Sequence, residues 1–130
     1  MKLLYRTILL STLSIFCIIN SVWAQRKSEA GNLLRHIVVV TFKPGTSDEQ
    51  MQAIDNSFKN LAKLNMVRGF EWGIGSEERD TSHVKHIYMI AFANKKDEAS
   101  YGASPQHQTH IKLAADYIES VSATDYFVNK

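Results

Sequence analysis

The segment from Tyr101 to Tyr117 holds many of the side chains in this sequence that could do acid/base chemistry. Ser104 followed by Pro105 is typical of a helix start, because a serine oxygen can accept a free amide of the first turn and proline has no amide proton to satisfy there. From that start, one helical face carries imidazoles first and apolar groups later, at spacings of three and four residues. Its members are His107, His110, Ile111, Ala114, Tyr117 and Ile118. The polar end of this face is the best candidate for a functional site.

His107 and Tyr101 have the side-chain types that proton transfer beside a carbonyl group requires. An imidazole titrates near neutral pH and can act as the base, and a phenol hydroxyl can donate a hydrogen bond to the oxygen that becomes negative. Tyr101 precedes His107 by six residues and lies ahead of the helix, so a turn between them could bring the two groups together. The alternative interpretation is that both are hydrogen-bonded packing residues.

Two further histidines, His36 and His86, lie on expected strands beside large apolar residues. They either contact a substrate or are core histidines with hydrogen-bond partners. His107 and His110 could form a metal-binding pair, because residues three apart share a helical face. A stable transition-metal site usually has three or four ligands, however, and the sequence marks no third one. We therefore expect no metal and no cofactor.

Residues 1 to 24 have the composition of a secretory signal peptide. Two basic residues precede an apolar run from Thr7 to Ile19, and Ala24 offers a small residue before a cleavage point. Removing this segment removes two of the 15 basic residues and none of the 13 acidic ones, so the remaining chain has no net charge. The remaining chain therefore lacks the positively charged surface with which proteins bind nucleic acids and anionic membranes. We expect a periplasmic or secreted protein that binds neither nucleic acid nor, after cleavage, a membrane.

The rest of the chain reads as one domain of alternating strands and helices. After a flexible lead-in at 25–32, the patterns predict strands at 33–42, 66–75, 85–93 and 123–128, helices at 48–64 and from Ser104 onward, and a short helical piece at 97–101. This order is that of an α+β, ferredoxin-like βαββαβ domain, which has a four-stranded antiparallel sheet with its helices on one face.

The strands at 33–42 and 85–93 are apolar on both faces. Helices on one side leave the other apolar face without cover, which implies a partner. Two copies packed sheet against sheet would cover it symmetrically. We expect a homodimer through the sheet face.

Nearly the whole chain after residue 24 resembles the stress-responsive α/β-barrel (Dabb) family of dimeric ferredoxin-like domains. The resemblance is carried by Arg35 to Lys43, Lys85 to Phe92, Tyr101 with Ser104-Pro105-Gln106-His107, and the closing Asp125-Tyr126-Phe127. The Tyr-x-x-x-Pro-x-His spacing together with a histidine near the start of the first strand is its most specific part. The resemblance implies a Dabb domain at 33–130 that forms a dimeric α+β barrel.

The resemblance also implies roles for individual residues. The family includes the plant polyketide cyclase that makes olivetolic acid, in which a tyrosine and a histidine between sheet and helix drive an intramolecular aldol condensation. By motif position, Tyr101 and His107 correspond to these catalytic groups. The residues expected to bind substrate are His36, His86, Phe92 and Ile111.

Two function classes follow from these observations. In the first, an exported dimer binds a small apolar or carbonyl ligand between sheet and helices and performs cyclase- or isomerase-like (lyase) acid/base chemistry. In the second, the dimer is a non-catalytic, stress-associated binding or structural module, and Phe92, Ile111 and their neighbours fill the space. Haem-degrading monooxygenases share the dimeric form and His107 could be an axial ligand, but no other residue points to haem. An open cavity that joins Tyr101 and His107 would favour the first class.

Overall fold

Four antiparallel strands form one sheet in the order β2-β3-β1-β4, as seen in a computed structural model that describes residues 32–75 and 83–128. The strands are β1 (Leu34–Phe42), β2 (Val67–Ile74), β3 (Lys85–Phe92) and β4 (Ile118–Phe127). The helices described are α2 (Asp48–Leu61), α3 (Lys95–Gly102) and α4 (Pro105–Ala114). The expected signal peptide and nearly all of the lead-in lie outside the described residues.

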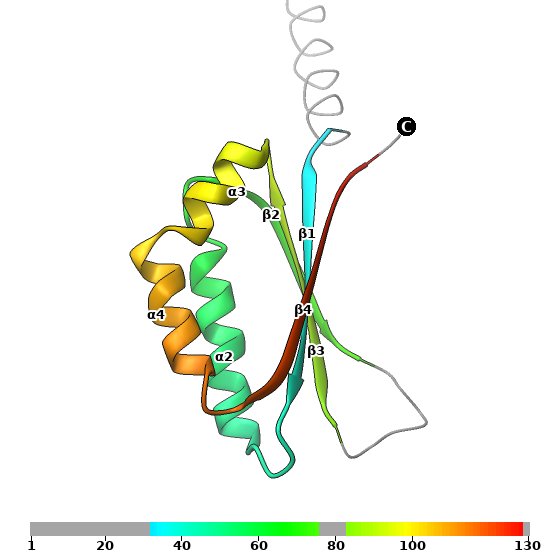
Figure 1. The fold of residues 1–130 in the computed structure, drawn as a ribbon, viewed down its shortest axis with the longest axis vertical. Coiled ribbons are helices and arrows are strands. Elements are labelled where there is room, and N and C mark those ends of the chain that lie inside the picture. The colour runs from blue at the N-terminus through cyan, green and yellow to red at the C-terminus, as the bar shows by residue number, and fades with distance from the viewer. Residues whose placement is uncertain (1–31, 76–82, 129–130) are drawn as a thin grey trace, which may run out of the picture. The chain divides into compact units, whose positions relative to one another are not determined.

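All three helices lie on one face of the sheet (Figure 1). The prediction of a ferredoxin-like βαββαβ domain is confirmed, with α3 and α4 together in the place of the second helix. Within the described ranges, no helix combines the length and the apolar character needed to cross a membrane.

The core lies between α2 and the middle of the sheet. The apolar stripe of α2 buries Ile54, Phe58 and Leu61 against the inward residues of β1 and β3. Phe58 stacks on Tyr88 with their ring centroids 3.7 Å apart. Burying one such side chain fully is worth roughly 1.5–3 kcal/mol, so this helix holds the centre of the sheet firmly.

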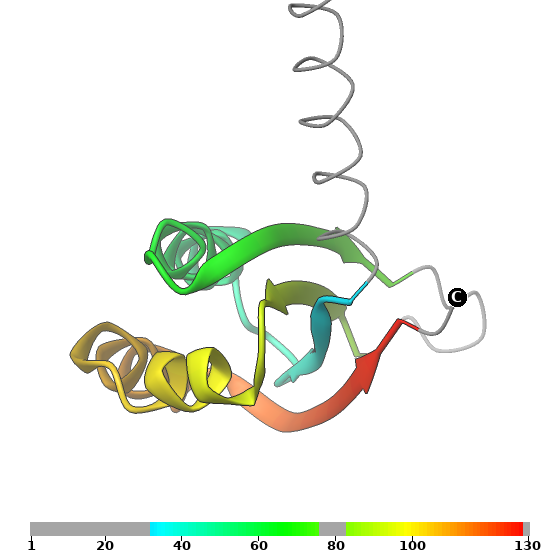
Figure 2. The same ribbon diagram turned by 90° about the horizontal axis from the view of Figure 1, so that it is seen from above.

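The opposite face of the sheet carries no described helix (Figure 2). Ile37 and Val39 of β1 lie there beside Met89 and Ile87 of β3, as cross-strand pairs. These four side chains are half-buried or exposed. The expectation that both faces of the central strands are apolar is therefore confirmed.

The second half of the chain differs from the prediction at one boundary. Tyr117 and Ile118 do not extend the helical stripe, because α4 ends at Ala114 and β4 begins at Ile118. The last strand therefore begins ahead of the position predicted for it, which was residue 123. The backbone amide of Lys43 donates to the carbonyl of Tyr117 at 2.9 Å, and its Nζ donates to the carbonyl of Asp116 at 2.9 Å. These contacts with the end of β1 direct the chain from α4 into the sheet. They join residues far apart in the sequence, so the local pattern of the helix could not reveal them.

Candidate functional site

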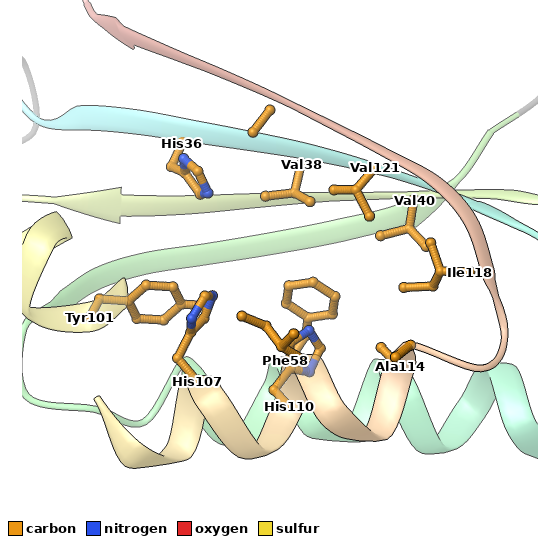
Figure 3. Close-up of a pocket in the computed structure, with 13 residues that line it drawn as sticks. His36, Val38, Val40, Phe58, Tyr101, His107, His110, Ala114, Ile118 and Val121 are labelled. Atoms are coloured by element: carbon orange, nitrogen blue, oxygen red, sulfur yellow. The ribbon is translucent and has the colours of Figure 1, made fainter. Parts of the chain in front are cut away.

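A cavity of about 460 Å³ lies between α4 and the strands β1 and β4 (Figure 3). α2 covers the centre of the sheet and leaves the edge strand β4 open, so that nine of the ten residues of β4 are exposed. The cavity lies in this less densely packed part of the molecule. Most of its wall is apolar and includes Val38, Val40, Phe58, Ile111, Ala114, Ile118, Val121 and Ala123. Its polar lining residues are His36, Tyr101, His107 and His110.

Tyr101 enters the cavity from the last turn of α3 and is 3% exposed. The Ser104 hydroxyl, which also caps α4, donates to the Tyr101 carbonyl at 2.7 Å and fixes the turn between the two helices. The Tyr101 hydroxyl is buried and has no hydrogen-bond partner in the described part of the chain. Burial raises the pKa of this phenol, so it stays protonated at neutral pH and can donate a hydrogen bond to an acceptor brought by a ligand.

His107 projects from the first turn of α4 toward Tyr101, with the two ring centroids 4.9 Å apart. Its Nδ1 is buried and, among the residues described, has no hydrogen-bond partner. Burial lowers the pKa of His107, repulsion between the protonated forms of His107 and His36 lowers it further, and a backbone hydrogen bond to Gly102 opposes both effects. The imidazole is therefore neutral at pH 7 and can accept a proton.

His36 reaches the cavity from β1, opposite α4 (Figure 3). Its Nδ1 lies 2.6 Å from Oδ1 of Asp125, its cross-strand neighbour on β4. Lys95 Nζ donates to the other oxygen of Asp125 at 2.7 Å and lies 2.9 Å from Glu98. Hydrogen bonds from Lys95 first, and then from His36, lower the pKa of Asp125 to about 2.

His36, Glu98 and Asp125 form, among the described residues, the one group whose donor atoms lie close enough to share a metal ion, all within 4.8 Å of one another. The Lys95 ammonium group already pairs with both carboxylates. The single positive charge of Lys95 thus offsets one of the two negative charges that would attract a metal ion.

His110 is buried one turn after His107 and lies on the same wall of the cavity. Its Nδ1 lies 3.0 Å from the hydroxyl of Ser57 on α2. Burial, with a smaller contribution from His107, lowers the pKa of His110 to about 4. His110 is therefore a neutral residue that joins the two helices.

The structure brings together four of the six residues that the sequence proposed for the site. Tyr101, His107, His36 and Ile111 line the cavity, whereas His86 and Phe92 are not part of its lining. Both belong to β3, where His86 faces Asp55 of α2 and Phe92 packs against the Tyr101 ring with the ring centroids 5.2 Å apart.

His86 belongs to a separate buried cluster. Its Nδ1 lies 2.8 Å from Oδ1 of Asp55 on α2, which also accepts the hydroxyl of Tyr88 at 2.5 Å. His86 thus has the environment of a core histidine with a hydrogen-bond partner, which was the other interpretation of its pattern.

Sequence reasoning missed Asp125 and Lys95 as parts of the site. Asp125 was noticed only as part of a closing motif, and its partnership with His36 depends on the register of β1 against β4. An acidic residue on an inward position of the last strand was the available signal. Lys95 is the first residue of α3 and carried no signal of its own.

Residues 34–128 match the family described as the stress responsive A/B barrel domain. The stress-response A/B barrel domain-containing protein HS1 of Arabidopsis thaliana is 28% identical over 100 residues, which cover 75% of this chain and 92% of that protein. The hydroxynitrile lyase of Passiflora edulis has the same fold, with a TM-score of 0.67 at 22% identity, over 77% of this chain and 96% of that one. A dimeric ferredoxin-like protein of unknown function from Bacteroides fragilis has a TM-score of 0.59 at 26% identity, over 73% and 95% of the two chains.

Proposed function

This chain belongs to the stress-responsive A/B barrel domain family, and we propose that it binds a small, largely apolar carbonyl compound in its cavity. We further propose that it removes a proton from the carbon atom next to the carbonyl group. One observation carries the proposal: the Tyr101 hydroxyl and His107 Nδ1 are both buried, belong to residues that line one cavity, and have no hydrogen-bond partner among the residues described. A buried polar group without a partner costs about 1–3 kcal/mol. A ligand that offers the missing partners would recover that cost.

The cavity wall supports this class of ligand. The apolar residues of β1, β4 and α4 suit a hydrocarbon or aromatic body, and the polar groups of Tyr101, His107 and His36 suit one oxygen-bearing end. The hydroxyl and the neutral imidazole also form a complementary pair, since the first donates and the second accepts.

The proposed chemistry uses these two groups in one step. His107 Nδ1 takes the proton from the carbon beside the carbonyl, the electron pair of the broken C–H bond forms the C=C bond of the enolate, and the carbonyl π electrons move to the oxygen. The Tyr101 hydroxyl donates a hydrogen bond to that oxygen as it becomes negative. The enolate can then attack a second carbonyl group, as in a cyclisation, or regain a proton elsewhere, as in an isomerisation.

The oligomeric state and the location of the protein are proposals too. The apolar outer face with Ile37, Val39, Ile87 and Met89 supports a homodimer formed by packing two sheets together, and the relative from Bacteroides fragilis is described as dimeric. Export rests on the composition of residues 1 to 24 alone.

A matched pair of probes tests the binding proposal. Acetophenone and ethylbenzene have similar shapes, but only acetophenone has a carbonyl oxygen. NMR titration of the protein should show acetophenone bound more tightly than ethylbenzene, and the Tyr101→Phe variant should lose that preference while still binding ethylbenzene. Equal affinity of the wild-type protein for both probes, or no binding of either, would contradict the proposal.

A further inference from the structure

Asp125 contacts His36 from outside the cavity. The two residues are cross-strand neighbours on the helix-facing side of the sheet, and Oδ1 of Asp125 lies 2.6 Å from Nδ1 of His36. His36 lines the cavity, whereas Asp125 does not. The carboxylate therefore acts on the cavity only through the imidazole.

The environment of Asp125 determines which nitrogen of His36 carries the proton. Its second oxygen accepts the Lys95 ammonium group at 2.7 Å, and its pKa lies near 2, so the carboxylate is ionised at neutral pH. An ionised carboxylate can only accept hydrogen bonds. The contact at 2.6 Å is then a hydrogen bond from the N–H at Nδ1, and a neutral His36 has no proton on Nε2.

We propose that Asp125 is a positioning residue that holds His36 in the Nδ1–H tautomer, so that its Nε2 is a second acid/base group on the cavity wall opposite His107. Lys95 and Glu98 support this arrangement from α3, because Lys95 Nζ lies 2.7 Å from Asp125 and 2.9 Å from Glu98. The role in reaction chemistry rests on the proposed function, whereas the tautomer does not.

Two imidazoles on opposite walls can divide the work of a proton shift. Figure 3 shows the rings of His36 and His107 on β1 and α4, with the polar end of the cavity between them. When His107 takes a proton from carbon, a protonated His36 can return one from Nε2 to the ligand oxygen or to a second carbon, and the two rings then exchange roles. This arrangement narrows the expected substrates to carbonyl compounds whose reaction removes a proton on one side of the molecule and adds a proton on the opposite side.

The tautomer of His36 can be measured directly by NMR of protein labelled with ¹⁵N in its histidine rings. In the wild-type protein near pH 7.5, we expect neutral His36 to carry its proton on Nδ1. In Asp125→Asn, the ratio of the Nδ1–H to the Nε2–H form should fall about tenfold, because the new amide can donate to the ring as well as accept from it. The control Glu119→Gln removes a carboxylate from the same strand and should leave this ratio unchanged.

An Nε2–H tautomer in the wild-type protein would overturn the proposal, and so would an unchanged ratio in Asp125→Asn. Adding acetophenone to the same samples separates the two proposals. If acetophenone shifts the Nε2 signal of His36 in the wild-type protein and shifts it less in Asp125→Asn, the result supports both the positioning role of Asp125 and the proposed function. The expected tautomer without any response to acetophenone supports the positioning role of Asp125 and contradicts the proposed function.

Discussion

The hydroxyl of Tyr101 should cost the folded protein stability, because it is buried without a partner in the described chain. Tyr101→Phe is therefore expected to leave the free energy of unfolding unchanged or to raise it by up to about 1 kcal/mol. Tyr88→Phe is the matched control. It removes a hydroxyl that donates to buried Asp55, so it should lower the free energy of unfolding by about 1–3 kcal/mol. Urea denaturation measures both, and a clear loss of stability in Tyr101→Phe would show that its hydroxyl has a structural partner.

His110 should make the protein sensitive to mild acid. Burial lowers its pKa from 6.5 to about 4 in the folded state, so the unfolded chain binds more protons between these two pH values. Its contribution to stability is fully present above about pH 6.5 and is lost as the pH falls toward 4, by up to about 3 kcal/mol.

The His110→Asn variant tests this pH dependence. The asparagine oxygen can take the place of Nδ1 beside Ser57 without titrating. The slope of unfolding free energy against pH between 4 and 6.5 should be shallower in His110→Asn than in the wild-type protein. Identical slopes in the two proteins would contradict the assignment of the acid sensitivity to His110.

At the scale of residues, the sequence predicted the types of group at the site better than their partners. The Ser104-Pro105 start and the helical spacing of the apolar residues together predicted that His107 lies on the inward face of α4, where it lines the cavity. The pairing of His36 with Asp125 depends on how β1 and β4 align across 89 positions of sequence, which no local pattern reveals. His86 shows the reverse case, since a strand histidine among apolar neighbours does not disclose that Asp55 lies above it.

At the scale of elements, the turn between α3 and α4 positions the site. Ser104 Oγ donates to the Tyr101 carbonyl at 2.7 Å and accepts the His107 amide at 3.2 Å. Ser104→Ala should lower the free energy of unfolding by about 1 kcal/mol and also weaken the binding of acetophenone, because both polar groups lose their anchor. Ser100→Ala, at an exposed position of α3, is the control and should change neither quantity. Weakened folding with unchanged binding would show that the cap stabilises α4 without orienting the site.

The elements themselves were largely predictable, because caps and periodicity are local. Ser47 accepts the Gln50 amide at 3.3 Å and the Gln50 side chain accepts the Ser47 amide at 2.9 Å, as the capping-box pattern indicated. The end of α4 was not predictable in this way. Ile118 fits an apolar helical stripe as well as a strand, and pairing with Phe42 of β1 decides between them.

At the scale of the whole molecule, the outer face of the sheet is expected to hold two copies together. Ile87→Glu places a charge among Ile37, Val39 and Met89 and should convert the dimer to a monomer, which sedimentation velocity would detect. Leu113→Glu makes the same kind of change at an exposed position of α4 and should leave the sedimentation coefficient at the value of the dimer. A wild-type protein that sediments as a monomer at micromolar concentration would contradict the expected dimer.

The measurement that tests the proposed chemistry most directly is the exchange of the methyl protons of acetophenone for deuterium in D₂O, followed by NMR. The wild-type protein should accelerate exchange over buffer alone, and His107→Gln should abolish the acceleration whereas His83→Gln should keep it. Since burial lowers the pKa of His107 below 6.5, the rate should be constant from about pH 7 upward and decrease only in acid. Exchange no faster than in buffer, or equally fast with His107→Gln, would contradict the assignment of His107 as the base.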